Sequence, residues 1–139
     1  PWQAARCAAN WDGKAHMGVD KWRAAARAAA RQSRRAYIPE VLDLHRTPDV
    51  LELVRKTKAD DGVVAALHES GRSRFVDLPV ATASRIVLIV GPEGGLDDGE
   101  LTALAEAGAS AVLLGPTVLR TSTAAAVALG ALGALTPRW

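Results

Sequence analysis

The chain has 139 residues, a mass of 14.6 kDa and 49% hydrophobic residues, which is the composition of a globular domain with one modest core. Its formal net charge of +2 indicates no class of partner, and its single cysteine, Cys7, excludes an internal disulfide or a zinc site built on several cysteines. No apolar run reaches the roughly 18 residues of a membrane span, so we expect a cytoplasmic protein with neither a membrane nor a metal partner. Because the chain begins with Pro1 and nothing near it resembles a signal peptide, we expect a fragment of a longer chain.

The first 35 residues are strongly basic. They hold eight Lys or Arg and two Asp, a net charge of +6, whereas the other 104 residues hold nine and thirteen, a net charge of −4. Residues 20–33 are rich in Ala and free of Gly and Pro, which predicts a helix. Arg23, Arg27 and Arg31 recur every four residues, so their guanidinium groups stack on one face. That face suits a nucleic acid, or a solvated surface with carboxylates arriving from elsewhere in the fold; both interpretations stay open.

Short apolar runs alternate with helical patterns in the rest of the chain. Residues 37–44 predict an extended segment, and Thr47 followed by Pro48 predicts the cap and start of a helix to about residue 58. Continuous apolar runs predict strands at residues 62–67, 85–90 and 110–114, and the polar residues 68–84 predict a loop. Asp97 and Glu100 predict a capping box for a helix to residue 107, and Thr121 or Ser122 opens the last helix. The fold class is α/β in one domain, a mostly parallel sheet covered by helices.

Two loops follow predicted strands at the sheet edge where ligands of α/β proteins bind. The first is Gly91-Pro92-Glu93-Gly94-Gly95, whose three glycines allow a ligand to touch bare backbone. The second spans residues 115–123, and Leu67 and His68 would form a third wall. Neither loop matches a common phosphate-binding motif, and Glu93 would repel phosphates. The pattern favours a neutral or cationic ligand, with a tight turn that holds no ligand as the alternative.

Several of these motifs together resemble one known family. The run RIVLIVGPEGGLDDGE, followed by LLGPTVLRTSTAAA, is similar to the RsmE family of SPOUT-superfamily methyltransferases. The stretch KWRAAARAAARQSRRAYIPEV and the opening PWQAARC also resemble segments of that family, so the similarity spans essentially the whole chain. The resemblance implies S-adenosylmethionine-dependent methylation of N3 of a uridine in 16S (small-subunit) ribosomal RNA.

The resemblance also implies a SPOUT-type fold with a C-terminal trefoil knot, whose loops hold S-adenosyl-L-methionine in a bent shape. Carried over residue by residue, the cofactor-binding set is Leu67, His68, Val90, Gly91, Pro92, Glu93, Gly94, Gly95, Leu114, Gly115, Leu119, Arg120 and Thr121. Backbone amides exposed beside glycines suit an adenine edge, and Leu114 and Leu119 suit its faces.

The chain departs from the family pattern in three ways. Ser122 replaces the family's Glu, which removes a carboxylate although Ser is expected to serve as a helix cap, and Arg34 replaces a glycine of the Gln-Ser-Gly-Arg motif. The family's N-terminal PUA-like RNA-binding domain and the first strand of its catalytic domain are expected to be absent. We therefore expect residues 1–139 to be weak or inactive on the substrate.

The reaction that the resemblance implies needs a group to stabilise the uracil anion formed when N3 loses its proton. Arg120, at the start of the last helix, is the first candidate for this catalytic role, and a salt bridge to Glu93 is the alternative. The RNA is expected to contact Arg23, Arg27, Arg31, Gln32 and Arg35, with the target base flipped out of its stack. None of the three histidines stands out as a general base.

The last helix, residues 123–135, is apolar all round, which indicates burial on every side. In so small a domain this predicts a homodimer, as is characteristic of the SPOUT superfamily. Two other functions stay open on the sequence: another SPOUT RNA methyltransferase of the ribose 2′-O type, and a catalytically silent RNA-binding or dimerisation module.

Overall fold

A computed structural model describes residues 1–9, 11 and 13–137. Its centre is a parallel sheet in the order β2-β4-β1-β3, made of β1 (Val63–Leu67), β2 (Ser73–Arg74), β3 (Ile86–Val90) and β4 (Ser110–Leu113). The register pairs Leu67 of β1 with Val90 of β3 and with Val112 of β4. The carboxyl ends of these three strands therefore meet at one edge, and the prediction of an α/β fold with a parallel sheet is confirmed.

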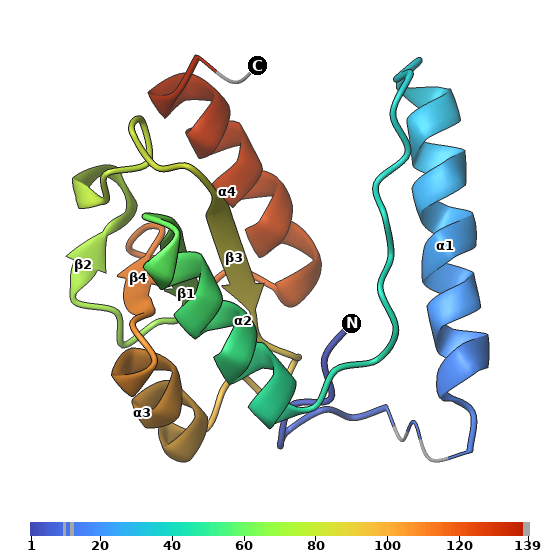
Figure 1. Ribbon diagram of the computed structural model, residues 1–139, viewed down its shortest axis with the longest axis horizontal. Coiled ribbons are helices and arrows are strands. Elements are labelled where there is room, and N and C mark those ends of the chain that lie inside the picture. The colour runs from blue at the N-terminus through green and yellow to red at the C-terminus, as the bar shows by residue number, and fades with distance from the viewer. Residues whose placement is uncertain (10, 12, 138–139) are drawn as a thin grey trace.

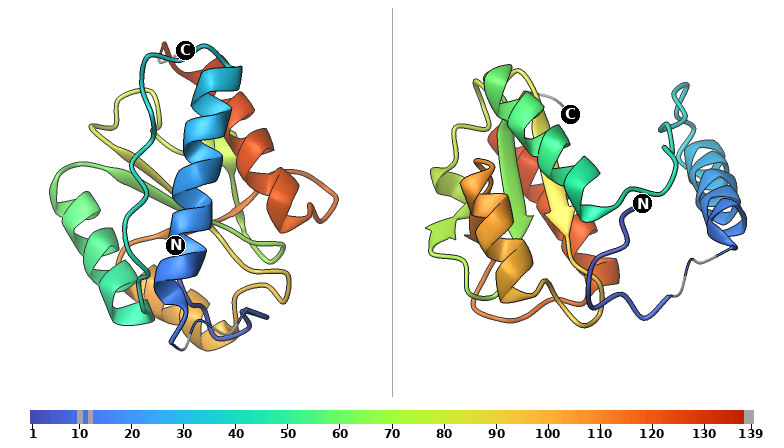
Figure 2. Two further views of the ribbon diagram at one scale, coloured as in Figure 1. Left: turned by 90° about the vertical axis from the view of Figure 1, so that its right-hand side faces the viewer. Right: turned by 60° about the horizontal axis from the view of Figure 1, so that its bottom comes forward.

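Helices cover both faces of the sheet because successive side chains of β1 point to opposite sides. Val64 and Ala66 pack under α2 (Thr47–Ala59) and α3 (Asp98–Glu106) in one core cluster. Val63 and Ala65 belong to the second cluster, with α4 (Thr121–Leu135) and the short helix η1 (Phe75–Asp77). Figure 1 and Figure 2 show α2 and α3 on one side of the strands and α4 on the other. Burial on both faces explains why the strands are continuous apolar runs.

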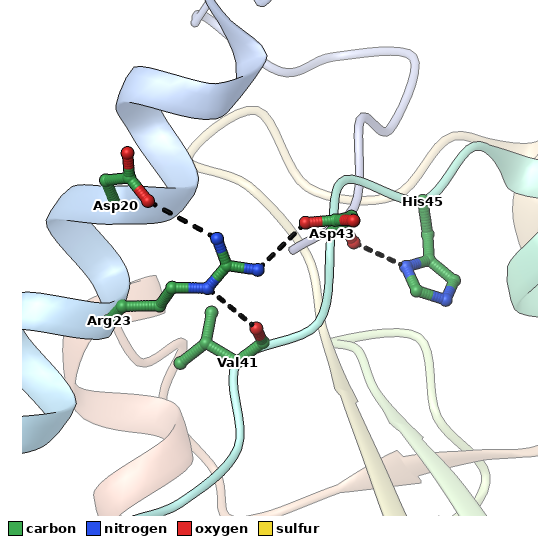
Figure 3. Close-up of polar contacts among 5 residues, drawn as sticks. All are labelled: Asp20, Arg23, Val41, Asp43 and His45. Carbon is green, nitrogen blue, oxygen red and sulfur yellow. Dashed lines mark hydrogen bonds and ion pairs between the residues drawn. The ribbon is translucent and has the colours of Figure 1, made fainter.

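Helix α1 (Ala15–Gln32) stands beside this core, as Figure 2 shows, and residues 33–46 return along it. Arg23 fastens the helix to the returning segment. Its guanidinium donates to the backbone oxygen of Val41 at 3.3 Å and to the carboxylates of Asp43 at 2.9 Å and Asp20 at 3.3 Å (Figure 3). The hydrogen bond that Arg23 donates to Asp43, helped by the one to Asp20, raises the pKa of Arg23 above its ordinary value.

Several predicted boundaries shift in the structure. Helix α1 begins at Ala15 rather than residue 20, with Lys14 as its N-cap, and the ring of Trp11 lies where a side chain at Gly18 would stand. The cap of α2 is Arg46, not Thr47: the backbone N–H of Arg46 donates to the carboxylate of Asp49 at 2.8 Å. Residues 37–44 form no strand, and the predicted loop 68–84 contains β2 and η1.

The connection from β4 to α4 crosses the carboxyl edge of the sheet. It starts on one side of β1 and ends at a helix that packs on β3, on the other side of β1. The trefoil knot implied by the family resemblance stays a prediction. In the part of the chain that the structure describes, no helix is both long and apolar enough to span a membrane.

Candidate functional site

The Gly91–Gly95 loop is a tight turn held at both ends by the core. Ile89 before it and Leu96 after it are buried. Within it, the N–H of Gly95 donates to the carbonyl of Pro92 at 2.8 Å, and Gly95 has a φ of +72°, which a side chain would strain. The loop therefore presents backbone groups in one fixed shape.

The start of α3 fixes the far end of this loop. The predicted capping box is confirmed: the N–H of Glu100 donates to Asp97 at 2.7 Å, and the N–H of Asp97 donates to Glu100 at 3.2 Å. Glu100 is only 6% exposed, and its other oxygen accepts a third bond, from the N–H of Ala5 at 2.8 Å. One buried carboxylate thus joins the loop, the helix and the N-terminal segment of the chain.

The second loop, residues 114–120, ends at the helix that carries the candidate catalytic arginine. Arg120 is the N-cap of α4, and its carbonyl accepts from Thr123 at 2.8 Å and Ala124 at 2.9 Å. Ser122 lies inside the helix, so its expected role as the cap is wrong. Among the described residues no ion pair joins Arg120 to Glu93, and the guanidinium is exposed.

The two loops enclose a cavity of about 830 Å³ at the carboxyl edge of the sheet. Every residue of the expected cofactor-binding set lines it, from β1, β3, β4 and the loops that follow them. The volume is in the range of small-molecule sites, and the walls combine leucine side chains with backbone groups of the glycines. Residues 47 positions apart in sequence, such as Leu67 and Leu114, are thereby brought to one site.

His68 forms part of the wall at the end of β1. The N–H of Ser70 donates to its Nδ1 at 3.1 Å, and the Ser70 hydroxyl lies 2.8 Å from the same atom. Because a backbone N–H only donates, Nδ1 is the acceptor and the ring proton sits on Nε2.

Arg6 is a wall of the cavity that sequence reasoning missed. Its Nη1 donates to the carbonyl of Gly94 at 3.3 Å, and a Cβ on Gly94 would lie 2.9 Å from the Cβ of Arg6. The contact joins residues 88 positions apart, and no local pattern around Arg6 signals it.

Comparison with known families decides what kind of domain carries this site. Residues 1–133 match a sequence model described as an RNA methyltransferase domain. The chain belongs to this RNA methyltransferase family. Its match covers both loops of the cavity, the basic helix and the N-terminal segment with Arg6. The resemblance to the RsmE family that the loop motifs predicted is confirmed.

Relatives of this RNA methyltransferase domain carry the name ribosomal RNA small subunit methyltransferase E. The Mycobacterium bovis protein is 58% identical over 139 residues, which cover 99% of this chain and 53% of the relative. The Bacillus subtilis protein is 33% identical, over 95% of this chain and 53% of its own. The chain thus spans about half the length of the curated relatives it matches.

Solved structures with sequence identities of 31% and 32% to this chain share its fold. The Legionella pneumophila protein Lpg2936, in complex with SAM, has a TM-score of 0.85 and 32% identity over 98% of this chain and 54% of its own. The Neisseria gonorrhoeae ribosomal RNA small subunit methyltransferase E, bound to S-adenosyl methionine, has a TM-score of 0.79 and 31% identity over 93% of this chain and 52% of its own.

The residues expected to contact RNA lie outside the cavity of this methyltransferase domain. Arg23, Arg27, Arg31 and Gln32 are on α1, Arg35 follows it, and none lines the cavity. Arg23 fits the alternative interpretation, a solvated helix face paired with carboxylates. Its guanidinium forms ion pairs with Asp20 and with Asp43, and Asp43 belongs to the returning segment. Arg27, Arg31, Gln32 and Arg35 are exposed.

Proposed function

We propose that this chain is the catalytic domain of a cytoplasmic enzyme that transfers a methyl group from S-adenosyl-L-methionine to N3 of a uridine in small-subunit (16S) ribosomal RNA. One observation carries the proposal: the Gly91–Gly95 loop and the residue 114–120 loop converge on a single cavity of about 830 Å³. Relatives named for this activity, and neighbours solved with the same cofactor, support the assignment. The target base rests on the family resemblance.

The residues present fit the cofactor. Leu67, Leu114 and Leu119 supply apolar surface for a flat ring, and the turn at Gly91 to Gly95 supplies backbone donors and acceptors for its polar edges. Among the described residues the cavity wall carries Glu69 and Glu93 beside Arg6 and Arg120, and this balance of charge suits a ligand that carries a sulfonium and no phosphate. When bound, the cofactor supplies an electrophilic methyl group for in-line displacement, so the protein contributes chiefly by positioning the two reactants.

Arg120 is the residue that we assign to the reacting base. The uracil N3 attacks as its proton leaves, and negative charge spreads onto the neighbouring oxygens. A guanidinium at the cavity wall, with no carboxylate of Glu93 paired to it, stabilises that charge. We assign no general base.

The exposed cations of α1 serve the RNA backbone in this proposal. Arg27, Arg31 and Arg35 would meet phosphates and Gln32 would donate to the RNA, whereas Arg23 holds the helix in place. The C-terminal end of α1 lies away from the carboxyl end of β3 (Figure 1). The arginines of α1 therefore bind RNA that flanks the target nucleotide, and not a base flipped into the cavity of the same chain.

The decisive experiment is calorimetric titration of the chain with S-adenosylmethionine and S-adenosylhomocysteine, together with melting curves. We expect saturable binding and a melting temperature that rises with ligand concentration, because a ligand that binds only the folded state stabilises it. ATP, which shares the adenosine but carries phosphates, is the control and should bind far more weakly.

The product then identifies the reaction. Nucleoside mass spectrometry of small-subunit ribosomal RNA after incubation should show N3-methyluridine. A ribose 2′-O-methyl product would assign the chain to another type of SPOUT methyltransferase. No heat and no shift in melting temperature would leave a silent RNA-binding or dimerisation module.

We further propose that a second copy of this chain covers α4. Ala124, Ala128 and Leu132 face the sheet, whereas Val127 is 42% and Leu129 is 53% exposed in the single chain. The expected burial of α4 on every side is therefore not met by one chain. Residues 124–135 of this helix include no polar side chain, and an exposed apolar face of this kind favours a self-complementary contact.

Light scattering tests the dimer. The chain should have twice its mass of 14.6 kDa, and Leu129→Glu should halve the measured mass because it places a charge in the contact. Leu53→Glu, on the opposite face of the sheet, is the matched control and should stay dimeric. A monomeric wild type would refute the dimer.

A further inference from the structure

We infer that Arg6 grips an RNA phosphate at the mouth of the cavity, an inference that rests on the function proposed above. Its place in the structure is the first reason. The N-terminal segment lies against the Gly91–Gly95 loop, and Arg6 lines the cavity while remaining exposed to solvent. A side chain at the mouth of the cavity contacts RNA that approaches from solvent, whereas the interior walls contact the small ligand.

The position of Arg6 is fixed by the contacts of the residues that precede it. The N–H of Ala5 is bound by the buried carboxylate of Glu100 at 2.8 Å, and the neighbouring Ala4 is buried in the core. Further back, the N–H of Gln3 donates to the carbonyl of His45 at 3.0 Å. The backbone is therefore held independently of the Arg6 side chain, so replacing that side chain leaves the segment seated.

The guanidinium is set up for an anion. It has five N–H donors, and within the part of the chain that the structure describes one of them is used, on the carbonyl of Gly94. Among the described residues no carboxylate lies within ion-pair distance of it. One hydrogen bond therefore positions the guanidinium, and its other N–H groups can bind the oxygens of a phosphate in pairs.

An RNA phosphate is favoured over the carboxylate of the cofactor. The bond from Arg6 to Gly94 is on the solvent side of the loop, at two exposed residues. By contrast, Ile89 and Leu96, which flank the same loop, are buried. Arg6 would thus hold the RNA next to the flipped nucleotide, and the arginines of α1 would hold it at a distance.

The test measures binding of a fluorescein-labelled oligouridylate across salt concentrations, and binding of S-adenosylmethionine by calorimetry. Arg6→Met removes the charge and keeps the stem that packs on Gly94. One lost phosphate contact should lower the slope of log affinity against log salt by about 0.7 and weaken binding about fivefold at 0.1 M salt, with cofactor affinity unchanged. Arg6→Lys should keep the wild-type slope.

Arg85→Met is the matched control, because Arg85 is exposed at the opposite edge of the sheet, beside the start of β1. It should leave the slope unchanged. The inference is overturned if Arg6→Met behaves like Arg85→Met, or if it weakens the cofactor instead of the RNA. A wild type that binds neither ligand would overturn the proposed function itself, which separates the two failures.

Discussion

Replacing Arg120 by alanine is expected to slow methyl transfer by about 10²–10³-fold while cofactor affinity stays the same. The charge that develops on uracil would lose its stabilising guanidinium. The backbone of Arg120, which caps α4 through bonds to Thr123 and Ala124, would be retained. Single-turnover transfer of a labelled methyl group to small-subunit ribosomal RNA measures the first effect, and calorimetry the second.

Two variants accompany this measurement. Arg120→Lys should recover part of the rate because it restores the charge without the planar fork. Arg85→Ala, which removes an arginine from the far edge of the sheet, should leave the rate at the wild-type value. Turnover that is unchanged in Arg120→Ala would remove this residue from the mechanism.

Replacing Gly94 by valine is expected to weaken cofactor binding more than tenfold. A Cβ at this position would stand 2.9 Å from the Cβ and 3.0 Å from the backbone oxygen of Arg6. Either the loop or the N-terminal segment must move, and both line the cavity. The clash falls on Arg6 rather than on the ligand, so the loss comes from a displaced wall.

Calorimetry with S-adenosylmethionine checks this prediction, and circular dichroism shows whether the chain stays folded. Ala105→Val adds branched bulk to an exposed position of α3 that does not line the cavity, and it should bind normally. Wild-type affinity in Gly94→Val would mean that the cofactor site is misplaced.

The sequence predicts the core of this fold because local and global requirements agree there. β1 is buried on both faces, so its residues had to be apolar throughout, and the capping box of Asp97 and Glu100 marks the start of α3 within the sequence itself. β2 is different. Its two residues form a strand only because they pair with Val112 and Leu113 of β4, and the surrounding polar residues give no strand pattern.

The candidate site divides in the same way. The glycine-rich loop and the loop before α4 follow recognisable strands, so their meeting at one edge follows from a parallel sheet. The contact of Arg6 with Gly94 and the ion pair of Arg23 with Asp43 were not predictable, because each joins distant segments.

The bond from Ala5 to Glu100 has a consequence for how the protein is made. Arg6 becomes a wall of the cavity, and the wall at the start of α4 is synthesised more than a hundred residues later. During synthesis the segment with Arg6 is made before the residues that it contacts in the folded domain. Contacts between residues so far apart in sequence slow folding. Ligand capture therefore reports that translation has passed the start of α4 and that two segments far apart in sequence have come together.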